Sequence, residues 1–85
     1  MSSTSRNILT FSQFLLRSKS LKLYRDILRT IKRIPNKEYQ GELKKLVRED
    51  FEQNRQQTDE EKIKYHLTRG RAFHEELITA LSLVN

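Results

Sequence analysis

The side chains best suited to chemistry in this 85-residue chain are basic, and three of them share one edge of a segment with helical periodicity. Lys44, Arg48 and Arg55 project to that edge, and the aromatic Phe51 lies at its border. Three of the segment's acids fall on its other side: Glu42, Glu49 and Glu52. Charges sorted in this way indicate a surface that binds an acidic partner, whereas an ordinary solvated helix face with i,i+4 ion pairs is the alternative.

Few residues of the chain have the types and spacing that catalysis requires. The chain has no cysteine, which excludes a thiol nucleophile, a disulfide and a cysteine-ligated metal, and it has no glycine-rich phosphate loop or serine-centred elbow. His66 and His74 would lie about 12 Å apart along a helix, too far to hold one metal ion together. We therefore expect a protein that is not an enzyme and that binds no metal or cofactor directly.

Three amphipathic helices are expected to position these residues. Pro35 ends the first helix, and a polar stretch from Asn54 to Asp59 ends the second. Thr58 and Glu61 have the spacing of a capping box at the start of the third. The expected helices cover 12–33, 38–55 and 59–82. Short connections between them predict an all-α fold, an antiparallel three-helix bundle that runs up-down-up.

Each expected helix has an apolar face that should contribute to the core. The residues on the three faces are Leu21, Leu23, Tyr24, Ile27, Leu28, Ile31 and Ile34, then Tyr39, Leu43, Leu46, Val47 and Phe51, then Ile63, Leu67, Gly70, Leu77, Ile78 and Leu81. Phe11, Phe14 and Leu15 fall outside the first face, so this start either bends away or packs on a different surface.

Two residues on these faces need a special explanation. Arg17 projects onto the apolar arc of the first helix, so its charge must reach the bundle edge or meet a partner. Gly70 lies in the middle of the third helix, where glycine costs about 1 kcal/mol relative to alanine. Either another part of the chain packs closely on Gly70, which is the commoner explanation, or the missing side chain leaves space for a ligand.

The charge of the chain is concentrated at one end. The formal charge is +6, and the first 37 residues carry nine lysines and arginines but only one acid, Asp26. The Ser/Thr-rich basic segment 1–11 has the composition of a mitochondrial targeting segment, with an ordinary basic N-terminus as the alternative, and it precedes one domain at 12–82. A chain this small buries a thin core, which a partner or ligand could complete.

Two motifs together resemble the LYR-motif (complex 1 LYR-like) family. Leu23-Tyr24-Arg25 lies in the first helix, and a stretch from Arg48 through Phe51 to Arg55 follows at the expected distance after the proline turn. The resemblance extends from about Phe14 to Leu81. It implies a three-helix adaptor of the mitochondrial matrix that binds acyl carrier protein, whose acyl-4'-phosphopantetheine enters the middle of the bundle.

The resemblance also implies the roles of individual residues. Positions implied to face the carrier or to form the centre of the site are Arg17, Tyr24, Arg25, Arg48, Phe51 and Arg55. Lys44 joins them because of its place on the same helix edge. Residues expected to line the acyl chain are Leu28, Val47, Leu67 and Gly70.

The resemblance leaves the client open between two readings. An assembly role for respiratory complex I is expected first, with iron–sulfur delivery or another respiratory complex as the alternative. The LYR tripeptide could be read by iron–sulfur transfer machinery, but we favour its use in packing and docking.

The residues bear on two other classes of function. A nucleic-acid-binding bundle fits the charge, but basic residues alternate with acids after residue 37, and neither an aromatic stacking surface nor a helix-turn-helix pattern is present. A membrane-surface helix at 9–34 would leave the other two apolar faces uncovered. No apolar stretch approaches the length needed to span a bilayer. We therefore expect no nucleic-acid partner and no stable membrane insertion.

Overall fold

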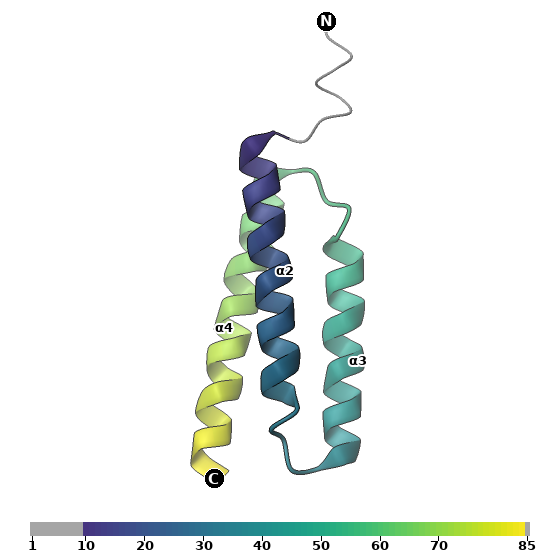
Figure 1. The fold of residues 1–85 in the computed structure, drawn as a ribbon, viewed down its shortest axis with the longest axis vertical. Helices are drawn as coiled ribbons and strands as arrows, with labels where there is room; N and C mark the ends of the chain where they lie inside the picture. The colour runs from purple at the N-terminus through teal and green to yellow at the C-terminus, as the bar shows by residue number, and fades with distance from the viewer. Residues whose placement is uncertain (1–9, 85) are drawn as a thin grey trace, which may run out of the picture.

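The computed structural model describes residues 10–84, which form three helices and no strand. They are α2 (Phe11–Ile31), α3 (Lys37–Asn54) and α4 (Glu60–Val84). α2 and α4 run in the same direction and α3 runs against them (Figure 1). The predicted antiparallel three-helix bundle is therefore confirmed. The predicted N-terminal segment 1–11 lies outside the described residues except for its last two positions.

Side-chain caps fix the starts of α2 and α3. Thr10 forms a capping box with Gln13: the Thr10 hydroxyl accepts from the Gln13 backbone N–H at 3.0 Å, and the Gln13 side chain accepts from the Thr10 N–H at 3.3 Å. At α3, the Asn36 side chain accepts from the Tyr39 N–H at 2.8 Å. These contacts satisfy backbone donors that the helix itself leaves unpaired.

The start of α4 differs from the prediction. The Asp59 carboxylate, and not Thr58, accepts from the backbone N–H of Glu61 at 2.9 Å, so the expected capping box at Thr58 is wrong. An ionised carboxylate is favoured beside the positive end of a helix dipole. The Thr58 carbonyl instead accepts from the Gln13 side chain at 2.8 Å, which ties the start of α2 to the loop before α4.

α2 is the central helix of the bundle. It packs against both α4 and α3, whereas α3 and α4 contact each other far less. It is helical without interruption from Phe11, so the expected bend before Arg17 is absent. Phe11, Phe14 and Leu15 do not pack on a different surface either, because all three are exposed.

Two hydrophobic clusters make up the core. The larger cluster lies where α2 ends and α3 begins, and we call it the lower core: Ile27, Ile31, Ile34, Leu43 and Leu81. The smaller lies near the start of α2 and α4, and we call it the upper core: Leu16, Ile63 and Leu67. Among the described residues, only Leu23 packs against both clusters.

A buried hydrogen bond adds to the contact between α2 and α4. The Thr30 hydroxyl donates to the Asp26 carbonyl at 3.0 Å, and the His74 Nε2 lies 2.8 Å from the same hydroxyl oxygen. Since the single hydroxyl hydrogen is already used, His74 donates to Thr30. His74 thus has a structural partner at the bundle edge.

Four residues of the expected apolar faces lie at the surface. Tyr39 and Leu46 are 54% and 60% exposed, and Leu21 and Ile78 are also exposed. The expectation that these side chains are buried is wrong. For Tyr39 and Leu46 the reason is that α4 does not close over the flank of α3 that carries them.

Candidate functional site

An aromatic stack joins α2 to α3. The rings of Tyr24 and Phe51 have centroids 4.3 Å apart and planes inclined by 15°. Both side chains are half-buried. A stacked pair of this kind is worth about 0.5–1.5 kcal/mol beyond its buried area. The structure therefore brings together the tyrosine of the tripeptide and the phenylalanine of the second motif.

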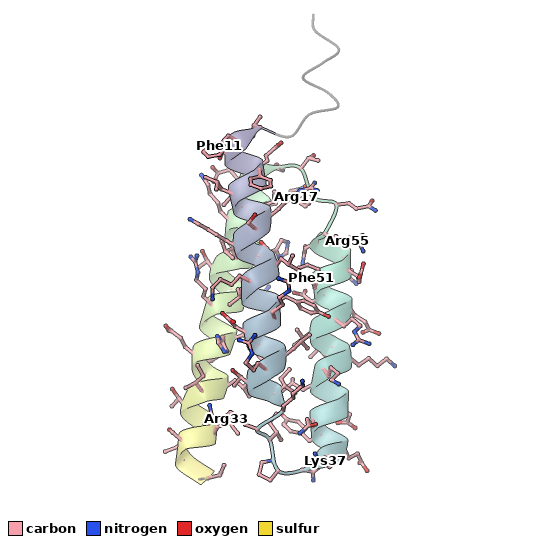
Figure 2. All side chains as sticks on the ribbon, viewed as in Figure 1. Phe11, Arg17, Arg33, Lys37, Phe51 and Arg55 are labelled. Carbon is pink, nitrogen blue, oxygen red and sulfur yellow. The ribbon has the colours of Figure 1, made fainter. Side chains whose placement is uncertain are left out.

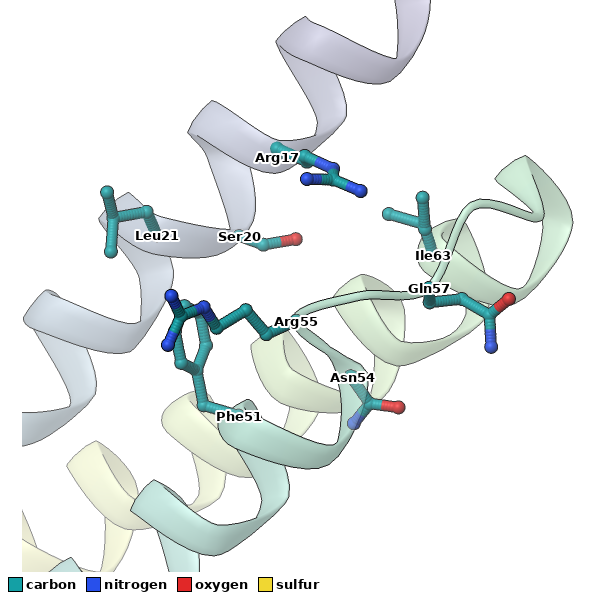
Figure 3. A pocket seen from close by; sticks show the side chains of 8 residues that line it. All are labelled: Arg17, Ser20, Leu21, Phe51, Asn54, Arg55, Gln57 and Ile63. Atoms are coloured by element: carbon teal, nitrogen blue, oxygen red, sulfur yellow. The ribbon is translucent and has the colours of Figure 1, made fainter. Parts of the chain in front are cut away.

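An outer cavity of about 450 Å³ opens beside this stack (Figure 3). Its lining residues are Arg17, Ser20, Leu21, Phe51, Asn54, Arg55, Gln57 and Ile63. Arg17 reaches it from α2 and Arg55 from the end of α3. The cavity thus combines an apolar interior with two guanidinium groups. Figure 2 shows Arg17, Phe51 and Arg55 toward the start of α2, with Arg33 and Lys37 at the other end of the bundle.

One buried atom of Arg17 has no partner in the part of the chain that the structure describes. Its side chain is half-buried, and its Nε atom is buried without a hydrogen bond to any of the residues 10–84. A buried polar group without a partner costs about 1–3 kcal/mol, and more when it is charged. An acidic group from another molecule could supply the missing acceptor.

Arg55 is only weakly engaged by the chain itself. Its guanidinium lies 3.1 Å from the Glu52 carboxylate, and these side chains are 62% and 56% exposed. Solvent-exposed pairs of this kind contribute little to stability. An external acid can therefore compete for Arg55 at small cost.

Three other predicted basic docking residues do not line the outer cavity. Arg25 and Arg48 are exposed, and Lys44 is half-buried. None of the three forms an ion pair within the described part of the chain. They extend the positive charge of the rim along α2 and α3.

Asp26 is the one acid among the first 37 residues, and it pairs with Lys22 and Arg29 instead of neutralising the predicted docking residues. Its carboxylate lies 2.9 Å from the Lys22 ammonium and 3.1 Å from the Arg29 guanidinium. The hydrogen bond from Lys22 is the largest cause that lowers the pKa of Asp26 below its usual value, and the charges of Lys22, Arg29 and His74 act in the same direction. Asp26 is thus occupied on the outer face of α2.

Two smaller cavities share lining residues in series with the outer one. We call the cavity of about 80 Å³ the middle cavity and that of about 290 Å³ the inner cavity. Val47 and Gly70, which were predicted to line an acyl chain, line both. Leu28 and Leu67 line none of the three, because Leu28 packs on the lower core and Leu67 is buried in the upper core.

Several polar lining residues were missed by sequence reasoning. Asp50 and His66 line both the middle and the inner cavity, and Asn54 lines the middle and the outer one. Helical spacing from Phe51 could have identified Asn54, which follows three residues later on the same side. Asp50 carried no such signal, because an acid in a charged helix is ordinarily a solvated residue.

The described residues offer no other obvious type of site. Residues 10–84 contain no group of three or more metal-ligating side chains. None of the helices described here is long and apolar enough to cross a membrane. The cavities and their arginine rim are therefore the candidate functional site.

Comparison with known proteins places these motifs in a family. The model of the Complex 1 protein (LYR family) matches residues 18–76. LYR motif-containing protein 2 of Homo sapiens is 40% identical over 75 residues, which cover 88% of this chain and 85% of that protein. The protein of the same name from Salmo salar is 35% identical over 77 residues, or 91% and 86% of the two chains.

The mouse protein of this name, from Mus musculus, is 38% identical over 77 residues, which cover 91% of this chain and 88% of that protein. No solved structure matches the chain significantly. Phe11–Phe14 and Arg29–Asn36 had predicted a likeness to LYR motif-containing protein 2, and these relatives confirm it. With a family model that covers most of its length, this chain belongs to the LYR family.

Proposed function

We propose that this protein is a mitochondrial adaptor that binds acylated acyl carrier protein and acts as an assembly factor for respiratory complex I. The observation that carries the proposal is the half-buried Arg17, whose Nε has no partner among residues 10–84, at the mouth of an apolar cavity. Membership of the LYR family supports the mitochondrial adaptor role. The name of the family model supports complex I as the client.

The charge of the rim favours an acidic carrier. Arg17 and Arg55 point into the outer cavity, and Arg25, Lys44 and Arg48 extend the positive surface around it. Opposite charges on two surfaces speed their encounter and fix their orientation. Among these residues, Arg17 would gain the most free energy from an acidic partner. Its Nε is already buried in the unbound protein without a hydrogen bond to residues 10–84.

The connected cavities favour a carrier that brings a fatty tail. Burial of about ten methylene groups at about 0.8 kcal/mol each provides about 8 kcal/mol before ordering costs. The whole stability of a small domain is typically about 5–15 kcal/mol. Acylation of the carrier would therefore decide much of the affinity and also stabilise the adaptor.

Charge reversal of the arginine rim tests carrier binding. We expect Arg48→Glu with Arg55→Glu to abolish binding of purified acyl carrier protein in titration calorimetry and to leave the far-UV circular dichroism nearly unchanged. Arg33→Glu with Lys37→Glu is the matched control, since these residues lie at the opposite end of the bundle. Retained binding in the first variant would contradict the proposal, and equal thermal stabilisation by acylated and unacylated carrier would contradict tail insertion.

The exposure of the tripeptide bears on the alternative of iron–sulfur delivery. Leu23 and Tyr24 are half-buried and used in packing, so only Arg25 of the motif is exposed. A partner that reads all three side chains would have to open the bundle. The structure thus supports packing and docking as the use of this motif.

Co-purification from mitochondria tests the client. We expect complex I subunits or assembly intermediates to accompany the tagged protein together with a small acidic carrier of acylated intact mass. Recovery of iron–sulfur assembly proteins without complex I subunits would favour the alternative client.

A further inference from the structure

The three cavities form a series with a narrow middle. The middle cavity shares Ser20, Phe51 and Asn54 with the outer one, and it shares five lining residues with the inner one. Its volume of about 80 Å³ compares with about 450 and 290 Å³ on either side. A chain that runs from the arginine rim along the bundle axis therefore meets the narrow middle before it reaches the inner cavity.

The first two residues of the LYR tripeptide lie at the constriction. Among the residues that line the middle cavity, only Leu23 and Tyr24 line neither of the other two. Tyr24 is held by its stack on Phe51. Leu23 is the side chain that packs against both the upper and the lower core. It thus lies where the two clusters of the core meet.

Gly70 is what Leu23 packs against across the bundle. A Cβ atom built on Gly70 would lie 2.8 Å from the Cδ2 atom of Leu23, closer than real Cβ contacts allow. The helix therefore requires glycine there as long as Leu23 keeps its place. Gly70 also lines both the middle and the inner cavity. Because Gly70 has no side chain, Leu23 packs closely on it, and the same position also borders the middle and inner cavities.

We propose that Leu23 and Gly70 form a gate that determines how long an acyl chain the bundle accepts. This inference rests on the proposed function and names the residues that set its substrate range. A short chain occupies the outer cavity alone. A long chain reaches the inner cavity while Leu23 lies against Gly70, and Gly70 provides the space for that position because it has no side chain.

The length of the path sets the expected threshold. Ten residues of α2 separate Arg17 at the rim from Ile27 at the inner cavity, a rise of about 15 Å. An extended chain advances about 1.25 Å per carbon at ordinary bond length and angle. About twelve methylene groups therefore reach from the rim to the inner cavity, whereas a chain of about six carbons ends near the constriction.

The experiment compares carrier loaded with a hexanoyl chain and carrier loaded with a tetradecanoyl chain, both titrated against the full-length protein. We expect the wild type to bind the long-chain carrier at least tenfold tighter. Gly70→Ala should weaken long-chain binding about tenfold and leave short-chain binding unchanged, because the new methyl group would displace Leu23 from its place against Gly70 into the path.

Gly41→Ala is the matched control for the glycine substitution. Gly41 lies in α3, and a Cβ atom there would meet nothing within 4 Å. This variant gains the same helix propensity, so we expect both affinities to stay at the wild-type values. A comparable loss of long-chain binding in Gly41→Ala would assign the effect to helix stability and overturn the gate.

A second substitution at Leu23 separates the gate from simple filling of the cavity. Leu23→Val removes the Cδ2 atom that meets the new methyl group, so Gly70→Ala with Leu23→Val should recover long-chain binding. A double variant that stays defective would overturn the gate. Leu23→Val alone should speed long-chain association several-fold, and an unchanged rate would likewise overturn it, even if Gly70→Ala fails to fold.

The outcomes also separate this inference from the proposed function. A wild-type protein that binds neither loaded carrier would overturn both. A wild-type preference for the long chain that persists in a folded Gly70→Ala variant would overturn the gate and leave carrier binding intact.

Discussion

The two ends of the bundle differ in how completely aliphatic side chains fill them. The lower core buries five aliphatic residues and contains Ile31, which is fully buried. The upper core buries three, and the flank of α2 and α3 beside it carries Arg17, Ser20 and Asn54 around a cavity. Polar side chains cannot seal that end, since their burial without partners is costly. The difference is between an end closed by aliphatic packing and an end where polar side chains line a cavity.

The largest expected effect tests whether stability resides in the lower core. Ile31→Ala should cost about 2–5 kcal/mol of the free energy of unfolding, because Ile31 is fully buried and the site is well packed. Leu21→Ala, at the 37% exposed wall of the outer cavity, should cost less than about 1 kcal/mol. Urea unfolding followed by circular dichroism measures both. Equal losses would show that the two ends contribute alike.

A substitution at the open end should have the opposite sign. Arg17→Met keeps the apolar stem but removes the guanidinium, whose Nε has no partner among residues 10–84, so we expect the unfolding free energy to rise by about 1 kcal/mol. The same variant should bind acylated carrier about tenfold more weakly, a loss of about 1.4 kcal/mol. Arg29→Met is the control, since Arg29 is exposed and paired with Asp26. A destabilised Arg17→Met protein would indicate that Arg17 supports the fold.

The smallest effect concerns pH. The pKa of Asp26 is lower in the folded protein than in the unfolded chain. Its contribution to the free energy of unfolding is therefore present above the unfolded pKa and is lost as the pH falls through the folded pKa. Asp26→Asn should therefore lower the thermal midpoint slightly at neutral pH and leave it unchanged at the acid end. Both partners are exposed, which keeps the effect small. A difference between the two proteins that is constant over the whole range would contradict this linkage.

The helices were predicted well, because helix breaks and helical periodicity depend on residues that are close together in the sequence. Pro35 and the polar stretch before α4 separate the helices, and the observed bounds differ from the predicted ones by no more than two residues. The family pattern implied that Tyr24 and Phe51 are central to the site, and the structure adds that their rings stack on each other. The cap of α4 was misassigned to Thr58, since two adjacent residues could both fill that role.

The candidate site was predictable only in part. Rotation along a helix identified the flank that carries Phe51 and Arg55, but it could not tell which apolar positions a neighbouring helix would cover. Tyr39 and Leu46 share the apolar face of α3, yet they are exposed because α4 packs on α2 instead. The same limit explains why Leu28 and Leu67 lie in the core and not along the cavities.

The sequence by itself determined three amphipathic helices, their order and direction, the family, and the positive charge of the first half. Each of these depends on periodicity, breaks and composition along a single chain. Only the tertiary structure decided that α2 is central, that the core is split, and that Leu23 faces Gly70 at the constriction. These features depend on how far α3 and α4 stand apart around α2, a distance that the periodicity of an individual helix does not contain.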